Sequence, residues 1–186
     1  MTMLVRPIES CLLVASPSLT CPIFGNTVVL LVDHREDGSL GFVLNRPADI
    51  GFDEVLRQVG VEEQARGPLG GAVPGDTPVL RGGPVSPETG WVLYDPGDEP
   101  ASGDDGVIRV GQHIEVCANV RMLRQIARGD GPARRTMMLG YAGWGPGQLD
   151  GEIREGSWIV SDLDPGFVFD VPVGERWTRA YAQMGI

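Results

Sequence analysis

The sequence contains no lysine: all 15 of its basic side chains are arginines, against 25 aspartates and glutamates. The absence of lysine excludes Schiff-base chemistry, a catalytic lysine base and the lysine of a phosphate-binding P-loop. The formal net charge is −10, so the field of the whole chain repels phosphate backbones. We therefore expect no direct binding to duplex DNA.

Five of the arginines fall within a stretch of fifteen residues. These five could form a basic patch that binds nucleic acid, or they could lie on the solvated face of a helix. We favour the solvated face. The arginines in question are Arg121, Arg124, Arg128, Arg134 and Arg135.

The sequence is also poor in the side chains of metal, redox and hydrolase sites. Its three cysteines, Cys11, Cys21 and Cys117, are odd in number and have no C-x-x-C spacing. They indicate neither a disulfide framework nor a zinc site, and we expect three free thiols. There are only two histidines, His34 and His113, and no G-x-S-x-G elbow, so a nucleophile with its activating base is not indicated.

His34 lies in an acidic stretch with Asp33, Glu36 and Asp37. This stretch lacks the glycine and the spacing of a calcium loop, and a histidine at the end of a strand is more often a hydrogen-bonding residue than a base. We interpret the stretch as a polar hairpin turn. The sequence thus predicts no catalytic residue, no metal site and no cofactor.

No run of 18 apolar residues is present, and the first residues lack a long apolar signal core. We therefore expect a cytoplasmic protein without a membrane segment. A chain of 186 residues with 42% hydrophobic side chains can bury a substantial core. We expect residues 1–9 to be a loose leader and residues 10–186 to form a single domain.

Apolar and β-branched runs predict short strands, and apolar residues at helical spacing predict helices. The predicted strands are 11–15, 27–32, 40–44, 79–81, 90–94, 107–110, 114–116, 136–139, 158–160 and 167–169. The predicted helices are 52–59, 120–127, a short one from Pro146, and 173–184. Glycine- and proline-rich loops are expected at 67–78 and 95–106. Because strands and helices do not alternate strictly, we expect an α+β fold with a mixed, largely antiparallel, barrel-like sheet and three or four helices.

Residues 140–149 read GYAGWGPGQL, with four glycines in eight residues. This density predicts that the strand 136–139 ends there and that the chain turns sharply into the short helix. On that helix Gln148 and Glu152 share one face. Trp144 is either a buried apolar wedge or a ligand platform beside these two polar side chains, and we favour the wedge.

Several short motifs extend from about residue 11 to the C-terminus. They include LVASPSL (13–19), GFVLNRP (41–47), GGPV (82–85), GYAGWGPGQL (140–149) and SW (157–158). On these motifs the chain resembles the YqgE/AlgH family of small, largely uncharacterised bacterial proteins. The resemblance implies an α+β fold around a mixed, barrel-like sheet, and it brings a label of transcriptional regulator. No helix-turn-helix or other DNA-reading module accompanies that label in this chain.

The chain departs from the family pattern at two places. The family usually has a histidine near Tyr94 and a Thr/Ser-Arg-Asp-like helix start near residues 117–121, where this chain has Cys-Ala-Asn-Val-Arg. A polar family site that relied on those two positions would differ here.

Two classes of function follow. We favour a non-enzymatic regulatory or adaptor protein that acts through contacts with a protein partner, and the alternative is a small-ligand-binding protein or enzyme with a pocket at the 140–149 corner. A cleft around Trp144 would favour the alternative, whereas a flat apolar patch would favour protein contacts. The sequence leaves the oligomeric state open. The candidate recognition residues, all at glycine- or proline-constrained corners, are Asn45, Arg46, Gly82, Gly83, Trp144, Gln148 and Glu152.

Overall fold

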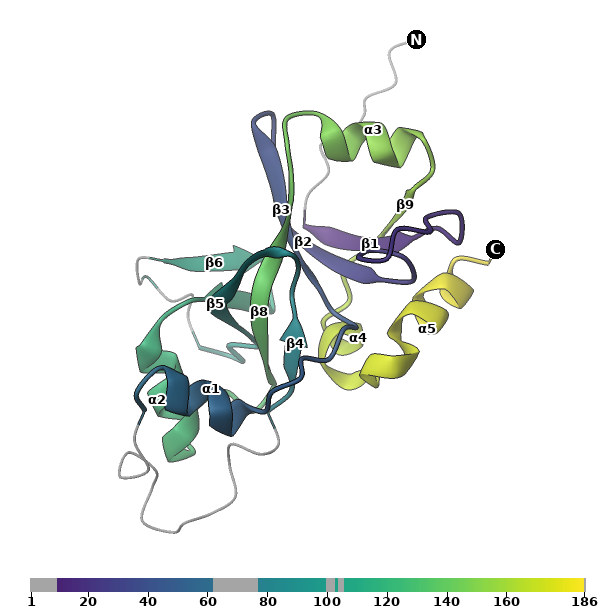
Figure 1. Ribbon diagram of the computed structural model, residues 1–186. Helices are drawn as coiled ribbons and strands as arrows, with labels where there is room; N and C mark the ends of the chain where they lie inside the picture. The colour runs from purple at the N-terminus through teal and green to yellow at the C-terminus, as the bar shows by residue number, and fades with distance from the viewer. Residues whose placement is uncertain (1–9, 62–76, 100–102, 104–105, 186) are drawn as a thin grey trace.

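The computed structural model describes residues 10–61, 77–99, 103 and 106–185 (Figure 1). The expected leader, 1–9, and most of the loop expected at 67–78 lie outside the described residues. Within these ranges the chain forms nine strands and five α-helices. The fold is a single α+β domain, as the sequence predicts, with five helices where three or four are expected.

The nine strands form one curled sheet, a half-barrel whose edge strand β6 comes close to β2 (Figure 1). Its order is β6-β7-β5-β8-β3-β2-β1-β9, and β4 pairs with β8. All strand pairs are antiparallel except β4 with β8. The strands are β1 (Cys11–Ala15), β2 (Val28–Arg35), β3 (Gly38–Val43), β4 (Val79–Arg81), β5 (Val85–Tyr94), β6 (Val107–Val110), β7 (Ile114–Cys117), β8 (Arg135–Trp144) and β9 (Trp158–Ser161).

The helices lie at three places around the sheet (Figure 1). They are α1 (Phe52–Gln58), α2 (Val120–Arg128), α3 (Gln148–Arg154), α4 (Pro165–Asp170) and α5 (Arg176–Gln183). The first two pack on the half of the sheet formed by β4, β5, β7 and β8 through a shared apolar cluster. The N-cap of α2 is Asn119, whose side chain accepts the Met122 N–H at 2.8 Å, and Gly129 ends the helix in the left-handed conformation.

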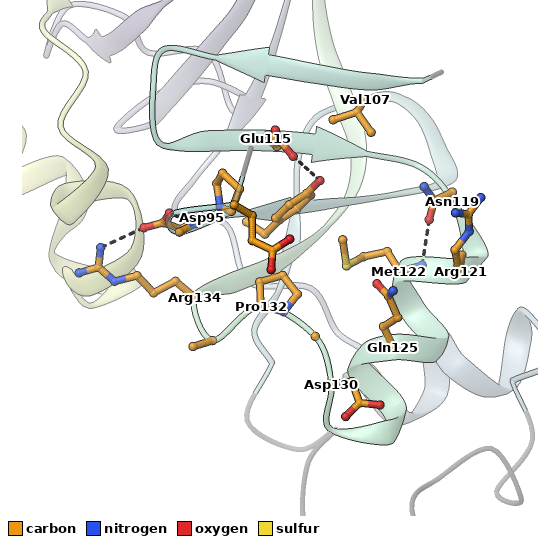
Figure 2. A pocket seen from close by; sticks show the side chains of 16 residues that line it. Asp95, Val107, Glu115, Asn119, Arg121, Met122, Gln125, Asp130, Pro132 and Arg134 are labelled. Atoms are coloured by element: carbon orange, nitrogen blue, oxygen red, sulfur yellow. Dashed lines mark hydrogen bonds and ion pairs between the residues drawn. The ribbon is translucent and has the colours of Figure 1, made fainter. Parts of the chain in front are cut away.

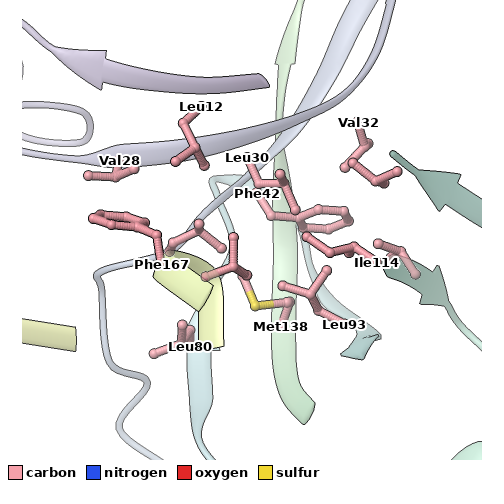
Figure 3. Close-up of a cluster of buried hydrophobic side chains, with 14 of the residues drawn as sticks. Leu12, Val28, Leu30, Val32, Phe42, Leu80, Leu93, Ile114, Met138 and Phe167 are labelled. Carbon is pink, nitrogen blue, oxygen red and sulfur yellow. The ribbon is translucent and has the colours of Figure 1, made fainter. Parts of the chain in front are cut away.

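The main core fills the concave side of the curled sheet (Figure 3). Leu30 on β2, Phe42 on β3 and Met138 on β8 are fully buried there, and Phe167 of α4 closes the cluster. β2 reads VVLLV before its polar end, which explains why both of its faces are buried.

Two polar anchors hold the C-terminal helices against the sheet. Arg176, only 3% exposed, donates to the carbonyl oxygens of Leu44 (2.7 Å) and Val171 (3.0 Å). Burial lowers the pKa of this guanidinium to about 10. The indole of Trp177 donates to the Ala15 carbonyl oxygen at 2.8 Å. Because a buried carbonyl that loses its donor is costly, these bonds fix α5 beside β1.

The prediction of a sharp turn at residue 140 is wrong, because β8 continues to Trp144. The first glycine of this stretch, Gly140, serves a close crossing of two segments instead of a turn. A Cβ on Gly140, which has a φ of +71°, would lie 2.6 Å from the Gly83 carbonyl oxygen. The facing strand β5 shows a register irregularity between Val85 and Gly90 at this point. The chain turns later, at 145–147, and α3 then begins at Gln148.

The strand predicted at 167–169 is also wrong, since these residues lie in α4. Asp164 caps that helix by accepting the Gly166 N–H at 3.0 Å, and Pro165 occupies its first turn. An Asp-Pro pair before an apolar run is a helix-start signal, and it outweighs a three-residue alternation that fits a strand equally well.

Candidate functional site

Trp144, the last residue of β8, is 5% exposed and forms an aromatic cluster with Phe24 and Trp158. Its ring stacks on Phe24 with centroids 6.2 Å apart and meets Trp158 edge-on at 6.0 Å. Phe24 also meets Trp158 edge-on at 5.8 Å. Rings at these separations contact one another directly, so the cluster has no space for a ligand between its rings.

One carboxylate satisfies both indoles of the cluster. The Oε2 atom of Glu152 accepts the N–H of Trp144 at 3.0 Å and the N–H of Trp158 at 2.9 Å. Its Oε1 atom accepts the side-chain amide of Gln148 at 3.0 Å. Gln148 in turn accepts the Gly145 N–H at 3.0 Å, which closes the turn into α3. Gln148 and Glu152 therefore share one face of α3, as their spacing predicts.

Asn45 and Arg46 follow β3 and hold the loop that carries Phe24. The Asn45 side chain accepts the Val28 N–H at 3.0 Å and donates to the Asn26 carbonyl oxygen at 2.8 Å. Arg46 donates to the Gly25 carbonyl oxygen at 2.5 Å. Both candidates thus reach the aromatic cluster only indirectly, through the loop they hold.

Gly82 and Gly83 cross β8 at its middle, before the strand reaches Trp144. The Gly82 N–H donates to the Leu139 carbonyl oxygen at 2.8 Å, so this donor is not available to a ligand. A Cβ on Gly82 would lie 2.3 Å from the Gly140 carbonyl oxygen. The structure thus brings Trp144, Gln148 and Glu152 together and leaves the two glycines apart from them.

His34 joins the β2–β3 hairpin to α3. Its Nδ1 atom lies 2.6 Å from the Ser39 hydroxyl oxygen, and its Nε2 atom lies 3.2 Å from a carboxylate oxygen of Asp150. The His34 side chain is 16% exposed. The sequence links His34 to its own hairpin, and the contact with α3 comes from tertiary structure alone.

A cleft of about 650 Å³ lies elsewhere, between β5, β7 and α2 (Figure 2). Tyr94 lies at the end of β5 and Glu115 on β7, while Met122 and Gln125 come from α2. The segment 130–134 completes the wall. Its lining combines apolar side chains, an amide and charges of both signs.

A buried acid lies at the floor of this cleft. Glu115 is 2% exposed, and its Oε2 atom accepts the Tyr94 hydroxyl at 2.6 Å (Figure 2). At the rim, Arg134 lies 3.6 Å from a carboxylate oxygen of Asp95 and also pairs with Asp170 of α4. The described lining contains no serine, threonine, cysteine, histidine or lysine. It thus provides groups for recognition and no activated nucleophile of these types.

The remaining reactive side chains are thiols, and none of the three cysteines is in a disulfide. Burial raises the pKa of Cys11 to about 11, with the Asp162 carboxylate adding to the shift. Burial also raises the pKa of Cys117. Cys21 is half-buried. Within the described ranges, no group of three or more His, Cys, Asp or Glu side chains is placed to hold a metal ion.

Sequence reasoning missed the cleft because its walls are far apart along the chain. Tyr94 and Glu115 face each other only because β5 and β7 pair in that register. One signal did point here: Tyr94 and the segment 117–121 are the two places where the chain departs from the YqgE/AlgH pattern. Tyr94, Asn119 and Arg121 all line the cleft.

Comparison with known proteins places this fold in a family. The family described as AlgH-like matches residues 12–186. The chain belongs to the AlgH-like family. Its relatives include UPF0301 proteins of Anaeromyxobacter dehalogenans, 39% identical over 174 residues (94% of this chain, 86% of the relative), and Xanthomonas campestris, 36% identical over 189 residues (100% and 94%). The names of these AlgH-like relatives state no activity.

Two solved structures share the AlgH-like fold. The solution structure of the AlgH protein from Pseudomonas aeruginosa is 32% identical, with a TM-score of 0.78 over 100% of this chain and 93% of that one. A crystal structure from Corynebacterium diphtheriae is 21% identical, with a TM-score of 0.73 over 96% and 87%. The second likeness concerns the fold alone. In the described part of the chain, no helix has the length and apolar character needed to span a bilayer.

Proposed function

We propose that this chain is a non-enzymatic, cytoplasmic protein of regulatory or adaptor type, which recognises a segment of a partner protein in the cleft between β5, β7 and α2. The observation that carries the proposal is the cleft itself. It offers the apolar Met122, the amide of Gln125 and the charged Arg134 on one concave surface. A protein segment presents the same mixture of groups.

The 140–149 corner supports the fold in this proposal. The indole groups of Trp144 and Trp158 and the amide of Gln148 all donate to the carboxylate of Glu152. A ligand would have to break these bonds before it could form its own, which is unfavourable. The corner therefore serves by holding α3 and the sheet in place.

A cytoplasmic location agrees with three cysteines that are all free, because thiols persist in a reducing compartment. A role in regulation would be exerted through proteins and not through duplex DNA. The net charge of −10 opposes contact with phosphate backbones.

A small-molecule ligand is the second candidate, and the cleft volume favours it. At about 650 Å³ the cleft lies within the range of roughly 300–1,000 Å³ that is typical of small-molecule sites. The exposed side-chain amide of Gln125 provides a polar group of the kind that such sites use. This candidate places the ligand in the cleft and not at the 140–149 corner.

The test compares two matched tryptophan substitutions in the full chain. Ala133 is exposed and lines the cleft, so Ala133→Trp puts an indole at its mouth. Ala182 is exposed on α5, away from the cleft lining, so Ala182→Trp adds the same ring elsewhere. Tagged wild type and both variants are purified from bacterial cells, and bound proteins and small molecules are quantified by mass spectrometry.

We expect wild type and Ala182→Trp to retain the same proteins and Ala133→Trp to lose them, with equal thermal midpoints for all three. If Ala133→Trp loses a bound small molecule but retains the same proteins as wild type, the result would favour a small-molecule ligand in the cleft. Identical retention by all three proteins would show that the cleft is not the site.

A further inference from the structure

The outer face of α2 carries an arginine stripe, which we define as Arg121, Arg124 and Arg128. All three side chains are exposed. At 3.6 residues per turn they lie within about 60° of one another around the helix axis. The opposite face is buried through Leu123 and Ile126. The stripe adjoins the cleft, because Arg121 also lines it.

Two features of this stripe are unfavourable for the helix by itself. The sequence of α2 is VRMLRQIAR, with three arginines and no carboxylate. Arg124 and Arg128 are like charges four residues apart, which destabilises a helix, and Arg121 lies in the first turn, where the helix dipole disfavours a cation. Within the described residues, no ion pair or hydrogen bond involves the side chain of Arg124 or Arg128. The helix thus presents two uncompensated cations in a chain with a net charge of −10.

We propose that the arginine stripe and the adjoining cleft bind an acidic, extended segment of a partner protein, an inference that rests on the function proposed above. The spacing fits such a segment. Arg124 and Arg128 are about 6 Å apart along the helix axis, and alternate residues of an extended chain are about 6.6 Å apart. Carboxylates at every second residue can therefore meet successive arginines, and guanidinium groups bind carboxylates in a bidentate manner.

The surroundings favour a peptide over a nucleic acid. The exposed carboxylates of Glu99 and Asp130 line the same cleft. A continuous row of phosphates would be repelled by them, whereas a peptide can place a neutral or basic residue opposite each one.

The test measures fluorescence anisotropy of a labelled peptide of about ten residues, long enough to span the stripe, with glutamate at every second position and threonine between. A second peptide has glutamine in place of glutamate, and a third probe is a short duplex DNA. The full chain is compared with Arg124→Gln/Arg128→Gln. The matched control is Arg109→Gln/Arg154→Gln, which removes two other exposed arginines and so changes the net charge equally.

We expect the glutamate peptide to bind more tightly than the glutamine peptide, and the stripe variant to lose roughly fivefold to tenfold in affinity. The control variant should bind as wild type, and raising the salt concentration should weaken the interaction. The stripe variant should unfold close to the wild-type temperature, because removing a like-charge pair offsets the loss of the favourable cation Arg128 in the last turn of α2.

Three results would overturn the proposal that the partner segment is acidic. They are equal binding of the two peptides, no binding of either peptide, and unchanged affinity in the stripe variant. Tighter, stripe-dependent binding of the duplex DNA would overturn it as well. If Ala133→Trp loses its cellular partners but the glutamate peptide does not bind the wild-type chain, the proposed function of the cleft stands. Only the proposal of an acidic partner segment then fails. If Ala133→Trp keeps those partners, the proposed function itself fails.

Discussion

The carboxylate of Glu152 lies 3.0 Å from the indole nitrogen of Trp144, and the same oxygen accepts the indole of Trp158 at 2.9 Å. A side chain of α3 thereby ties the end of β8 to β9. The Trp144 and Trp158 rings are 5% and 2% exposed, so water cannot readily replace this acceptor. The bond to Glu152 thus links the stability of the corner to one carboxylate.

Removing this acceptor should be costly. Glu152→Ala leaves two indole N–H groups without a partner, and we expect a loss of about 2–4 kcal/mol in the free energy of unfolding. Glu152→Gln should lose less, because its amide oxygen can still accept from both indoles. It loses only the bond from Gln148, whose NH₂ group would face a second NH₂ group. Urea denaturation of both variants measures the difference. Equal midpoints for Glu152→Ala and wild type would contradict the role assigned to this carboxylate.

Trp144→Ala should destabilise the protein by roughly 3–5 kcal/mol, since it removes a buried ring and leaves a cavity beside Phe24 and Trp158. Gln148 is exposed, and Gln148→Ala should change stability by only about 0.5 kcal/mol. Denaturant unfolding and partner binding should be measured for both variants. A Trp144→Ala protein that unfolds as wild type yet loses partner binding would identify the corner as a recognition site.

Two glycines of β8 should respond differently to substitution. Gly140→Ala would force a side chain into the left-handed region, with its Cβ 2.6 Å from the Gly83 carbonyl oxygen. Gly143 is exposed, and the nearest atom to a Cβ there is 3.8 Å away, so both Gly143→Ala and Gly143→Val should fold. We expect a loss of about 2 kcal/mol or more for Gly140→Ala only. Thermal unfolding of the pair is the measurement, and equal midpoints would count against the close crossing.

The three thiols should differ in how quickly a reagent modifies them. In native protein at neutral pH, a thiol reagent should modify Cys21 quickly and Cys11 and Cys117 slowly, and denaturation without reductant should reveal all three.

Because burial raises the pKa of Cys11 to about 11, the folded state holds a proton that the unfolded state releases near the ordinary thiol pKa. Stability from this group is therefore complete below pH 9 and falls as the pH approaches 11. Cys11→Ala should flatten that part of the stability profile, and an unchanged profile would refute the assignment.

Much of the architecture was determined by local sequence. The β2–β3 hairpin follows from β-branched and apolar runs on either side of Asp37-Gly38, and α2 follows from Leu123, Ile126 and the stop at Gly129. The α+β class follows from the irregular order of such elements. These are short-range patterns, and they hold because each residue's neighbours in sequence are also its neighbours in the element.

Tertiary structure decided what Gly140 does. The sequence shows that glycine can adopt backbone conformations that other residues avoid, but it does not show whether a second segment passes close by. Gly83 approaches Gly140 through a contact between segments more than fifty residues apart in the chain. Tertiary structure also decided the role of Glu152, whose position on α3 is predictable while its two indole partners are not.

The cleft is likewise a product of tertiary structure alone. The sequence determined that Tyr94 ends one strand and that Arg121 lies in the first turn of a helix. Only the pairing of β5 with β7 places Tyr94 against Glu115, and only the packing of α2 brings Arg121 to the same cleft. A concave surface depends on how elements far apart in the chain are oriented, and no local pattern of residues encodes that orientation.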